Sequence, residues 1–421
     1  MKHESANPVC LALIMMLALL MAFTIPATAQ TRADLEMQYR TWLEEKIWPR
    51  AGAKGVERQT FVTAFDGITL NWALPDLVIP DAAPAQDTAQ LQAEFGAPSR
   101  YFSANALAGA TTVGRQMARQ HADTLARVEA QTGVPGHIIL GIWGRESAYG
   151  RAAIPHDAFD VLGTLGFLSS RASYFTDELI AALQVAQAGH AGNGPLRSSW
   201  AGALGQPQFM PSNVLKYAVD GNGDGRADIW GSEADTIASI GNYLARHGWV
   251  AARDWGFEVH VPEAVSCALE GPDQGRPISE WEAMGIARVS GQPFPDHERR
   301  EEGFLLMPAG RFGPTFIVTP NFYVLKEYNM SDLYALFVGH VGDRIAFGMG
   351  DFRAPWQPVD QLYRSDIAVM QEGLVALGHD VGGVDGLPGF KTRRSIGKWQ
   401  MSTGQPPSCF PSAGMAALLR Q

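Results

Sequence analysis

Residues 138–147 constrain this chain most, because they place one carboxyl on an otherwise apolar helix face. Ile139, Ile142 and Trp143 recur at helical spacing, and Glu146 falls on the same face. A carboxyl held among apolar neighbours loses hydration, which disfavours its charged form and raises its pKa. Glu146 is therefore a candidate proton donor near neutral pH.

The boundaries of this helix are also predicted from the sequence. Thr132 is a candidate N-cap, Pro135 suits the first turn, and Gly150 is a suitable stop. The alternative role for Glu146 is structural, as an ion-pair partner of Arg145 or another cation, because structural pairs also perturb pKa values.

Length and charge limit the class of protein. A chain of 421 residues is too long for one compact core, so two or three domains are expected. Apolar residues make up 46% and charged residues 18%, which is typical of a folded protein. The formal net charge is −10 and no basic stripe occurs, so nucleic acid is not expected as a partner.

Residues 1–29 have the pattern of a secretory signal. Lys2 precedes an apolar run, and Ala27-Thr28-Ala29 has the small-x-small form of a cleavage site. An uncleaved anchor is the alternative, but the run is short for a bilayer span of roughly 20 residues. We expect cleavage before Gln30 and an exported, periplasmic protein without a permanent membrane anchor.

Two cysteines remain after such a cleavage, Cys267 and Cys409. An oxidising compartment permits a bridge between them, and two free buried thiols are the alternative.

Helical patterns dominate the chain. A first helical stretch is expected to break at Pro49, and an aromatic-rich apolar stripe along it indicates core. The segment 75–98, rich in Pro, Ala and Asp, reads as a surface loop. The expected helical regions are 33–64, 105–131, the Glu146 helix, 158–187 and 321–347.

A smaller β part interrupts the helices. Residues 257–261 alternate like a strand, and 304–307 with 315–319 flank a Pro/Gly turn and predict a hairpin. A short helix is expected around Trp281. The pattern predicts a small mixed β insertion at about 257–319 within a helical protein.

A second motif lies at 199–212 and combines small residues with polar and flat apolar groups. Gln208 offers a donor and an acceptor, while Phe209 and Met210 offer apolar surface. That combination suits a sugar, which carries hydroxyls at its rim and apolar faces. The alternative is a tightly packed turn before a helix at Ser212.

Together these motifs resemble the membrane-bound lytic transglycosylase B family, lysozyme-like enzymes of bacterial cell-wall turnover. The resemblance rests on G-R-E-S at 144–147 and G-A-L-G-Q-P-Q-F-M-P-S at 202–212. It continues through N-Y-L at 242–244, G-W at 248–249, and N-F-Y with Y-N-M-S-D-L-Y between 321 and 334. It covers roughly residues 34–345. Gln206-Pro207 departs from the aromatic and glycine that relatives often carry.

The resemblance implies a predominantly helical α+β fold with a lysozyme-like catalytic core. It implies cleavage of the β-1,4 bond between N-acetylmuramic acid and N-acetylglucosamine in peptidoglycan glycan strands, with 1,6-anhydromuramyl ends. Glu146 is the implied acid and base, and no cofactor is needed for the chemistry. The implied substrate-groove residues are Ser147, Arg171, Tyr174, Ser199, Gln208, Phe209, Met210 and Tyr243, and Tyr323 and Tyr328 are further candidates that core packing would equally explain.

Residues 220–235 resemble a calcium loop. Asp220, Asn222 and Asp224 alternate, and Gly225 supplies the sharp turn. Gly231 occupies the usual position of the bidentate Glu, so Asp235 is the better candidate in a longer loop. Family members are thought to bind calcium here, which predicts a structural Ca²⁺; the alternative is an Asx-rich turn without an ion.

The C-terminal stretch resembles the three-helix peptidoglycan-binding domain of many wall enzymes. V-D-G at 384–386, Gly389, Thr392 and W-Q at 399–400 carry this resemblance. Such a domain would tether the enzyme to the wall. The expected organisation is signal peptide 1–29, catalytic region 30–348, linker 349–359 and peptidoglycan-binding domain 360–421.

Two other functions remain open from the sequence. A muramidase-type hydrolase needs a second carboxylate, and Asp157, Asp160, Asp177 and Glu178 are the nearest that follow Glu146 in sequence. A non-catalytic wall-binding scaffold is the other, which an intact Glu146 disfavours. Exo or endo attack, glycan length, oligomeric state and protein partners in wall synthesis are not encoded in these motifs.

Overall fold

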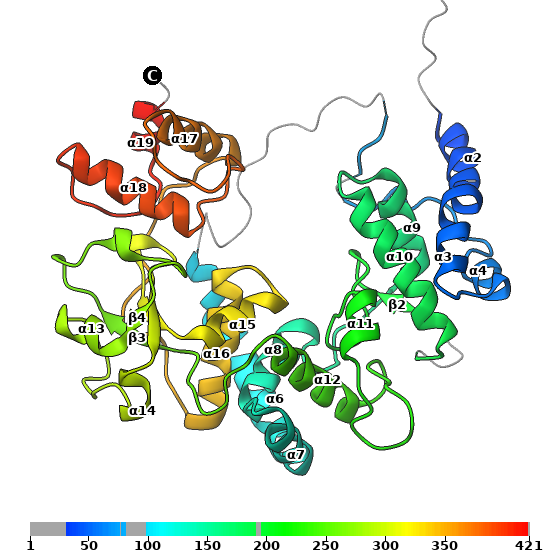
Figure 1. Ribbon diagram of the computed structural model, residues 1–421, viewed down its shortest axis with the longest axis horizontal. Helices are drawn as coiled ribbons and strands as arrows, with labels where there is room; N and C mark the ends of the chain where they lie inside the picture. Colours follow the sequence, from blue (N-terminus) through cyan, green and yellow to red (C-terminus); the bar gives the residue numbers. More distant parts are fainter. Residues whose placement is uncertain (1–30, 76, 81–97, 191–194, 420–421) are drawn as a thin grey trace, which may run out of the picture.

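The computed structural model describes residues 31–75, 77–80, 98–190 and 195–419 (Figure 1). The predicted signal peptide and most of the predicted loop at 75–98 lie outside these residues. Within them, no helix combines the length and the apolar character needed to cross a bilayer. The described part of the chain is predominantly helical, as the sequence predicts, with a five-stranded sheet and a two-stranded one.

The N-terminal helices pack beside two later helices on one side of the molecule (Figure 1). The sequence predicts a break at Pro49. In the structure a π-helical turn immediately precedes α3, and Pro49 lies in the first turn of α3, where a missing N–H costs least. These elements are α2 (Arg32–Trp42), η1 (Leu43–Ile47), α3 (Trp48–Ala53), α4 (Arg58–Ala64), α9 (Ala158–Leu168) and α10 (Ala172–Gln187).

A central helix is enclosed by its neighbours. The helix α8 (Gly136–Ser147) packs against α6 (Ala104–Gln120), α7 (Ala122–Thr132), α12 (Glu233–Arg246) and α16 (Asp332–Phe347). Gly141 permits a close approach to α16, because a Cβ there would lie 2.5 Å from the carbonyl oxygen of Val338. The helix α15 (Pro320–Tyr328) precedes α16 across a short turn.

The predicted start of α8 is wrong in one respect. Thr132 ends α7 instead of capping α8, and its hydroxyl donates to the Val128 carbonyl at 2.6 Å. Gly133 follows in the left-handed conformation at φ +71° and closes α7. Pro135 is the N-cap of α8, so α8 begins later in the chain than the sequence pattern predicts.

The β insertion forms one five-stranded sheet in the order β4-β6-β7-β3-β5. All four strand pairs are antiparallel, and the expected hairpin is the β6–β7 pair. A separate small core containing Trp281 and Cys267 lies against it. The strands are β3 (Gly256–His260), β4 (Arg276–Pro277), β5 (Ala287–Arg288), β6 (Glu302–Leu306) and β7 (Thr315–Val318).

Short elements complete this part of the chain. They are η2 (Pro98–Phe102), β1 (His156–Asp157), β2 (Arg197–Ser198), α11 (Pro211–Tyr217), η3 (Cys267–Leu269), α13 (Ile278–Ala283), α14 (Asp296–Arg299) and η4 (Gly310–Phe312).

Three C-terminal helices form a unit above the sheet in Figure 1. They are α17 (Arg364–Ala376), α18 (Phe390–Ser402) and α19 (Ala413–Leu419). Their own core includes Met370, Ile396 and Trp399. Gln371 is buried among them, where its side chain donates to Thr392 at 3.1 Å and accepts from Gly386 at 2.8 Å.

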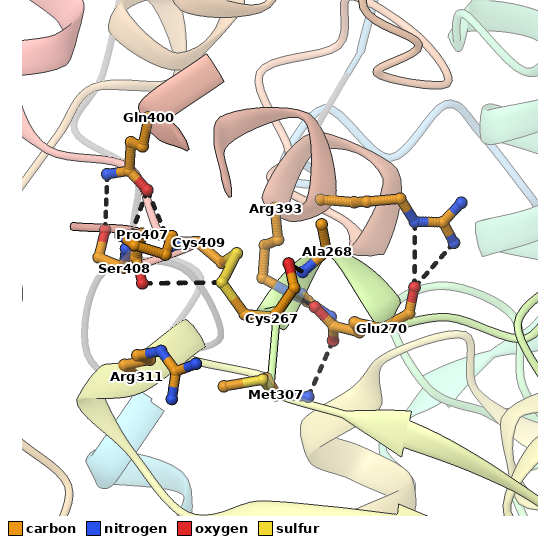
Figure 2. Close-up of a disulfide and its surroundings, with 12 residues drawn as sticks. Cys267, Ala268, Glu270, Met307, Arg311, Arg393, Gln400, Pro407, Ser408 and Cys409 are labelled. Carbon is orange, nitrogen blue, oxygen red and sulfur yellow. Dashed lines mark hydrogen bonds and ion pairs between the residues drawn. A yellow bond between two sulfur atoms is a disulfide. The ribbon is translucent and has the colours of Figure 1, made fainter. Parts of the chain in front are cut away.

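A disulfide joins this unit to the sheet insertion. Cys267 and Cys409 are bonded, with Cα atoms 6.2 Å apart and a sequence separation of 142 (Figure 2). Of the two alternatives that the sequence leaves open, the bridge is the one observed. Gly397 of α18 lies directly against the sulfur atoms, so no larger residue fits there.

We expect loss of this disulfide to loosen the C-terminal unit. The Cys267→Ala/Cys409→Ala variant should lower the free energy of unfolding by about 2–4 kcal/mol, because a long loop is no longer closed in the unfolded chain. Thermal unfolding and limited proteolysis would measure this, with earlier cleavage expected near residues 349–360. An unchanged melting temperature would show that the other contacts of the unit suffice.

Candidate active site

The candidate acid, Glu146, lies in the last turn of α8. Ile139, Ile142 and Trp143 of the same face are fully buried, as their spacing predicts. The helix ends at Ser147, and the next three residues, Ala148, Tyr149 and Gly150, all have positive φ, at 50°, 62° and 76°. This reversal is why the chain leaves the helix immediately after Glu146.

Tyr334 of α16 donates a short hydrogen bond from its hydroxyl to Glu146 Oε1. The Glu146 residue keeps some exposed surface, but protein atoms surround its carboxyl group. Burial raises the pKa of Glu146 to about 7, and the Tyr334 hydroxyl and the Arg145 guanidinium oppose this rise. The group is therefore protonated in mildly acidic solution and still able to ionise near neutrality.

Arg145 is not a tight ion-pair partner of this carboxyl. Its guanidinium lies 4.6 Å from the Tyr101 ring centre and 5.3 Å from that of Phe337, and it donates to the Tyr101 hydroxyl at 3.0 Å. Cation–π contact of this kind holds the charge beside the site without neutralising Glu146. The structural ion pair considered for Glu146 with Arg145 is thus not formed.

An aromatic cluster extends from Tyr334 across the site. Tyr328 stacks on Tyr334 with ring centres 6.4 Å apart, and the Tyr243 and Phe209 rings lie 4.8 Å and 5.7 Å from Tyr328. The Tyr328 hydroxyl donates to the Pro207 carbonyl at 2.7 Å, and the Tyr243 hydroxyl donates to the Glu327 carbonyl at 2.7 Å. Four predicted or motif residues, distant in sequence, are thereby joined to Glu146.

The turn at residues 202–210 is held against α8 by Gln206. Its amide oxygen accepts from the Trp143 indole N–H at 2.9 Å, and its amide nitrogen donates to the Trp230 carbonyl at 3.0 Å. Gln206 thus has a structural role in this turn. Gln208 has φ +53°, and its side-chain amide donates to the Gly205 carbonyl at 2.9 Å.

Other predicted groove residues are placed differently. Ser147 is buried and accepts from the Gly150 N–H at 3.0 Å, and Ser199 Oγ accepts from the Ala203 N–H at 3.1 Å, so both hydroxyls brace turns. Arg171 and Tyr174 are exposed around the start of α10, where the guanidinium lies 5.9 Å from the Tyr174 ring centre.

Two more predicted residues lie mainly in packing environments. Tyr323 is half-buried and packs edge-on against Phe304, with ring centres 5.1 Å apart. Met210 is half-buried and contacts the main core. A sugar contact by either residue stays a prediction.

The carboxylates considered for a second catalytic role are all engaged elsewhere. Asp157 accepts from the Phe159 N–H at 2.9 Å, and Asp160 accepts from the Asn71 amide at 2.9 Å. Asp177 pairs with Arg50 at 2.5 Å, and the buried Glu178 accepts from the Ser212 hydroxyl at 2.8 Å. These contacts serve helix capping and packing, and none of them involves Glu146.

A raised pKa alone does not mark the site. Burial raises the pKa of Asp343 to about 7 as well, and Asp343 accepts from the Trp255 indole N–H at 3.0 Å near the other end of α16. Asp343 is nine residues beyond Tyr334 and outside the motif residues that surround Glu146. Position beside the aromatic cluster is what singles out Glu146.

The predicted calcium loop carries oxygen donors throughout. Asp220 accepts from the Gly225 N–H at 2.7 Å, and the buried Asp235 accepts from the Gly221 and Asp228 N–H groups at 2.9 and 2.8 Å. Asn222 donates to Asp224 at 3.0 Å. Carboxylate and amide oxygens are the ligand type that Ca²⁺ prefers, so the donor set fits the ion.

The geometry of that loop differs from a closed metal site. Across the described ranges, one group of three His, Asp or Glu side chains brings its ligand atoms within 4.8 Å, namely Asp254, His297 and Glu298 in the sheet insertion. In the loop the carboxylates instead accept backbone N–H groups. Asp228, whose Oδ1 accepts from Trp230 and Gly231, is a further oxygen donor that the sequence pattern does not single out.

Comparison with known proteins adds the decisive observation. The family profile described as "Transglycosylase SLT domain" matches residues 38–343. The chain belongs to the membrane-bound lytic transglycosylase B family. Members of this family are lyases that act on peptidoglycan.

Solved and curated relatives agree. The chain is 34% identical to membrane-bound lytic murein transglycosylase B of Escherichia coli over 236 residues, which is 54% of this chain and 61% of that protein. It is 36% identical to SltB3 of Pseudomonas aeruginosa in complex with NAG-NAM-pentapeptide, with a TM-score of 0.80, 91% of this chain and 99% of that chain covered. The E. coli transglycosylase Slt35 in complex with calcium is 32% identical, with a TM-score of 0.51, and the match covers 61% of this chain and 80% of that chain.

Two features of this site are not singled out by the sequence pattern. Tyr334 closes the Y-N-M-S-D-L-Y motif, yet its hydrogen bond to Glu146 spans 188 residues of sequence. Gln206 reads as a departure from the family, whereas in the fold it ties the motif turn to Trp143. Helix spacing would have identified Tyr334 as a partner of Glu146 only if the packing of α16 on α8 were already known.

The pKa of Glu146 predicts how activity of the transglycosylase depends on pH. A proton donor must be protonated at the start of the reaction, so kcat should be nearly constant at pH 5–6 and fall about tenfold per unit well above pH 7. Initial rates on soluble peptidoglycan fragments would measure this. A descending limb near pH 4.5 would show that the Glu146 carboxyl is hydrated.

Proposed function

We propose that this protein is a lytic murein transglycosylase that cleaves the β-1,4 bond between N-acetylmuramic acid and N-acetylglucosamine and leaves 1,6-anhydromuramyl ends. The observation that carries the proposal is the environment of the Glu146 carboxyl. Burial raises its pKa to about 7, and the Tyr334 hydroxyl donates a hydrogen bond to it. Family membership supports the substrate class, because structures of the relative SltB3 hold NAG-NAM-pentapeptide and NAG-anhNAM-pentapeptide.

One carboxyl suffices for both halves of this reaction. Protonated Glu146 donates its proton to the glycosidic oxygen as the bond to the anomeric carbon breaks. The N-acetyl oxygen of the muramyl sugar stabilises the anomeric carbon from within the substrate. The Glu146 carboxylate then takes the proton of the 6-hydroxyl, whose oxygen bonds to the anomeric carbon, so the proton returns to Glu146 and no water is consumed.

Tyr334 balances these two roles of Glu146. A carboxyl that is buried without a donor would hold its proton too tightly to act as a base in the second half. The Tyr334 hydroxyl donates to the carboxylate form and lowers the pKa against burial, so both protonation states are accessible near neutral pH.

A hydrolase is the weaker alternative. The four carboxylates that could activate water are engaged in capping, in packing or in an ion pair with Arg50. The glycan is expected to lie along the aromatic cluster, with Gln208 near the N-acetyl group and the exposed Arg171 near a muramyl or peptide carboxylate.

Digestion of purified peptidoglycan tests the reaction. The protein should release muropeptides with anhydromuramyl ends, and Glu146→Gln should reduce their rate of release by roughly 10²–10⁴-fold, because the amide cannot donate the proton. Mass spectrometry of the products distinguishes anhydro from reducing ends. Asp343→Asn, which alters another carboxyl whose pKa is raised to about 7, is the matched control and should leave the products unchanged.

Reducing ends would replace the lyase with a hydrolase. Wall binding without any cleavage by either protein would leave the scaffold function. Equal cleavage by Glu146→Gln and the unaltered protein would remove Glu146 from the chemistry.

We also infer that the loop at 220–235 takes a structural Ca²⁺. Asp220, Asn222, Asp224 and Asp235 would hold the ion, with Asp228 as a further donor, and the ion would supply charge neutralisation and loop order without entering the reaction. The calcium complex of Slt35 supports this inference.

Calcium should therefore stabilise the fold. With an affinity of roughly 10⁻⁴–10⁻³ M, 10 mM Ca²⁺ should add about 1.4–2.7 kcal/mol to the free energy of unfolding. Thermal unfolding with and without Ca²⁺ would measure the gain, which Asp220→Asn should largely remove. Asp66→Asn, at another exposed acidic position, is the control; a similar loss in both variants would indicate non-specific screening.

The ends of the chain complete the proposal. Residues 1–29 would direct export to the periplasm and be removed before Gln30. The helices α17–α19 would form the peptidoglycan-binding domain after a linker at 349–359, and would raise the local concentration of substrate at the wall.

A further inference from the structure

A buried cluster of charges lies where the C-terminal unit meets the rest of the molecule. Arg393 of α18 donates to Glu270 through Nη2 at 2.6 Å and Nε at 3.1 Å (Figure 2). The same Nη2 donates to Asp332 at 2.9 Å, and Lys326 donates to the other oxygen of Asp332 at 2.6 Å. Glu270 is 0% and Arg393 1% exposed.

The cluster is electrically balanced and well bonded. Two carboxylates face one guanidinium and one ammonium, so no net charge is buried. Glu270 also accepts from the Met307 N–H at 2.9 Å, and Arg393 donates to the Pro388 carbonyl at 3.1 Å. Removal of one member would leave an unpaired buried charge, which is costly.

The cluster contacts both sides of the short turn between α15 and α16. Asp332 is the first residue of α16, and Tyr334, the donor to Glu146, follows two residues later. Lys326 lies two residues before Tyr328, the ring that stacks on Tyr334. The Ser331 hydroxyl caps α16 by accepting from the Tyr334 N–H at 3.2 Å.

A chain of direct contacts thus runs from the C-terminal unit to the acid. It passes from Arg393 to Asp332, along the first turn of α16 to the Tyr334 hydroxyl, and from there to Glu146. A helix turn is stiff, so a shift of its first residue displaces the hydroxyl two residues later. Because a hydrogen bond weakens steeply with distance and angle, a small displacement changes what Tyr334 does to the Glu146 pKa.

We propose that Arg393 is a positioning residue for Glu146, and that the C-terminal unit thereby completes the active site in addition to any role in wall binding. The proposal rests on the proposed function. Arg393 does not touch the reacting atoms; it acts through Asp332 and Tyr334.

A neighbouring ion pair provides a matched control. Arg394 also spans the junction, where it donates to the Glu270 carbonyl at 2.7 Å and to the Asp273 carboxylate at 2.9 Å. Asp273 is 52% exposed, and the recorded hydrogen bonds and ion pairs of Arg394 involve neither α15 nor α16. Arg393→Lys and Arg394→Lys therefore each replace a planar guanidinium by an ammonium, one residue apart. Only the first weakens the contact with Asp332.

The pH dependence of kcat reports the position of Tyr334. The groups that face the Glu146 carboxyl are Tyr334 of α16, Tyr328 of α15 and Arg145 of α8. Burial and the nearby Glu146 charge raise the pKa of both tyrosines well above 10, so neither titrates near neutrality. A loosened Tyr334 stabilises the carboxylate less, and the descending limb of kcat should then move to higher pH.

The experiment compares full-length variants on soluble peptidoglycan fragments, with anhydromuramyl ends as the product measured. Arg393→Lys should raise the descending limb by roughly half a pH unit or more and lower kcat several-fold, with KM little changed. Arg394→Lys should keep the pH profile of the unaltered protein. In a Tyr334→Phe background, Arg393→Lys should produce no further shift of the limb, because the hydroxyl it positions is absent.

Three results would overturn the proposal: an unshifted limb in folded Arg393→Lys, an equal shift in Arg394→Lys, or the same shift with and without the Tyr334 hydroxyl. If Arg393→Lys does not fold, Asp332→Asn replaces it, since it weakens the same contact from the other side, and the same outcomes apply. Failure of the unaltered protein to form anhydro ends would instead refute the proposed function.

Discussion

The active site depends on one constraint, which is that the Glu146 carboxyl must lose most of its water and keep a single strong donor. Burial raises its pKa to about 7, and the Tyr334 hydroxyl limits that rise. Both effects require α16 to lie close to α8. Gly141 makes this approach possible, because any side chain there would meet the backbone of α16 at Val338. A glycine in the middle of a buried helix is thus linked to the chemistry one turn away.

The C-terminal unit is attached more firmly than a tether requires. The Cys267–Cys409 disulfide and the buried pair of Arg393 with Glu270 fasten it to the sheet insertion (Figure 2). A flexible linker would raise local substrate concentration, but it would not fix the orientation of the unit. The observed junction fixes α18 against the start of α16, through the contact of Arg393 with Asp332. The proposed wall binding and the geometry of the candidate active site then share one structural connection.

The two carboxyls with pKa values near 7 show why environment and position must be read together. Asp343 is as strongly desolvated as a catalytic acid, but its hydrogen bond to Trp255 places it among packing residues of α16 and the sheet. Glu146 lies beside Tyr334 and Tyr328, in the aromatic cluster that the motif residues form. Desolvation supplies the proton affinity, and the surrounding surface determines what substrate can use it.

The sequence by itself determined the helical class, the apolar face that carries Glu146, the hairpin and the family, because these depend on local periodicity and on short motifs. It did not determine the start of α8, since Thr132 has the chemistry of a cap but lies at the end of the preceding helix. Contacts across long separations were decided only by the tertiary structure: the Tyr334–Glu146 bond, the Gln206–Trp143 bond and the disulfide. The physical reason is that such pairs form when helices dock, and docking depends on the packing of whole faces, which no local pattern encodes.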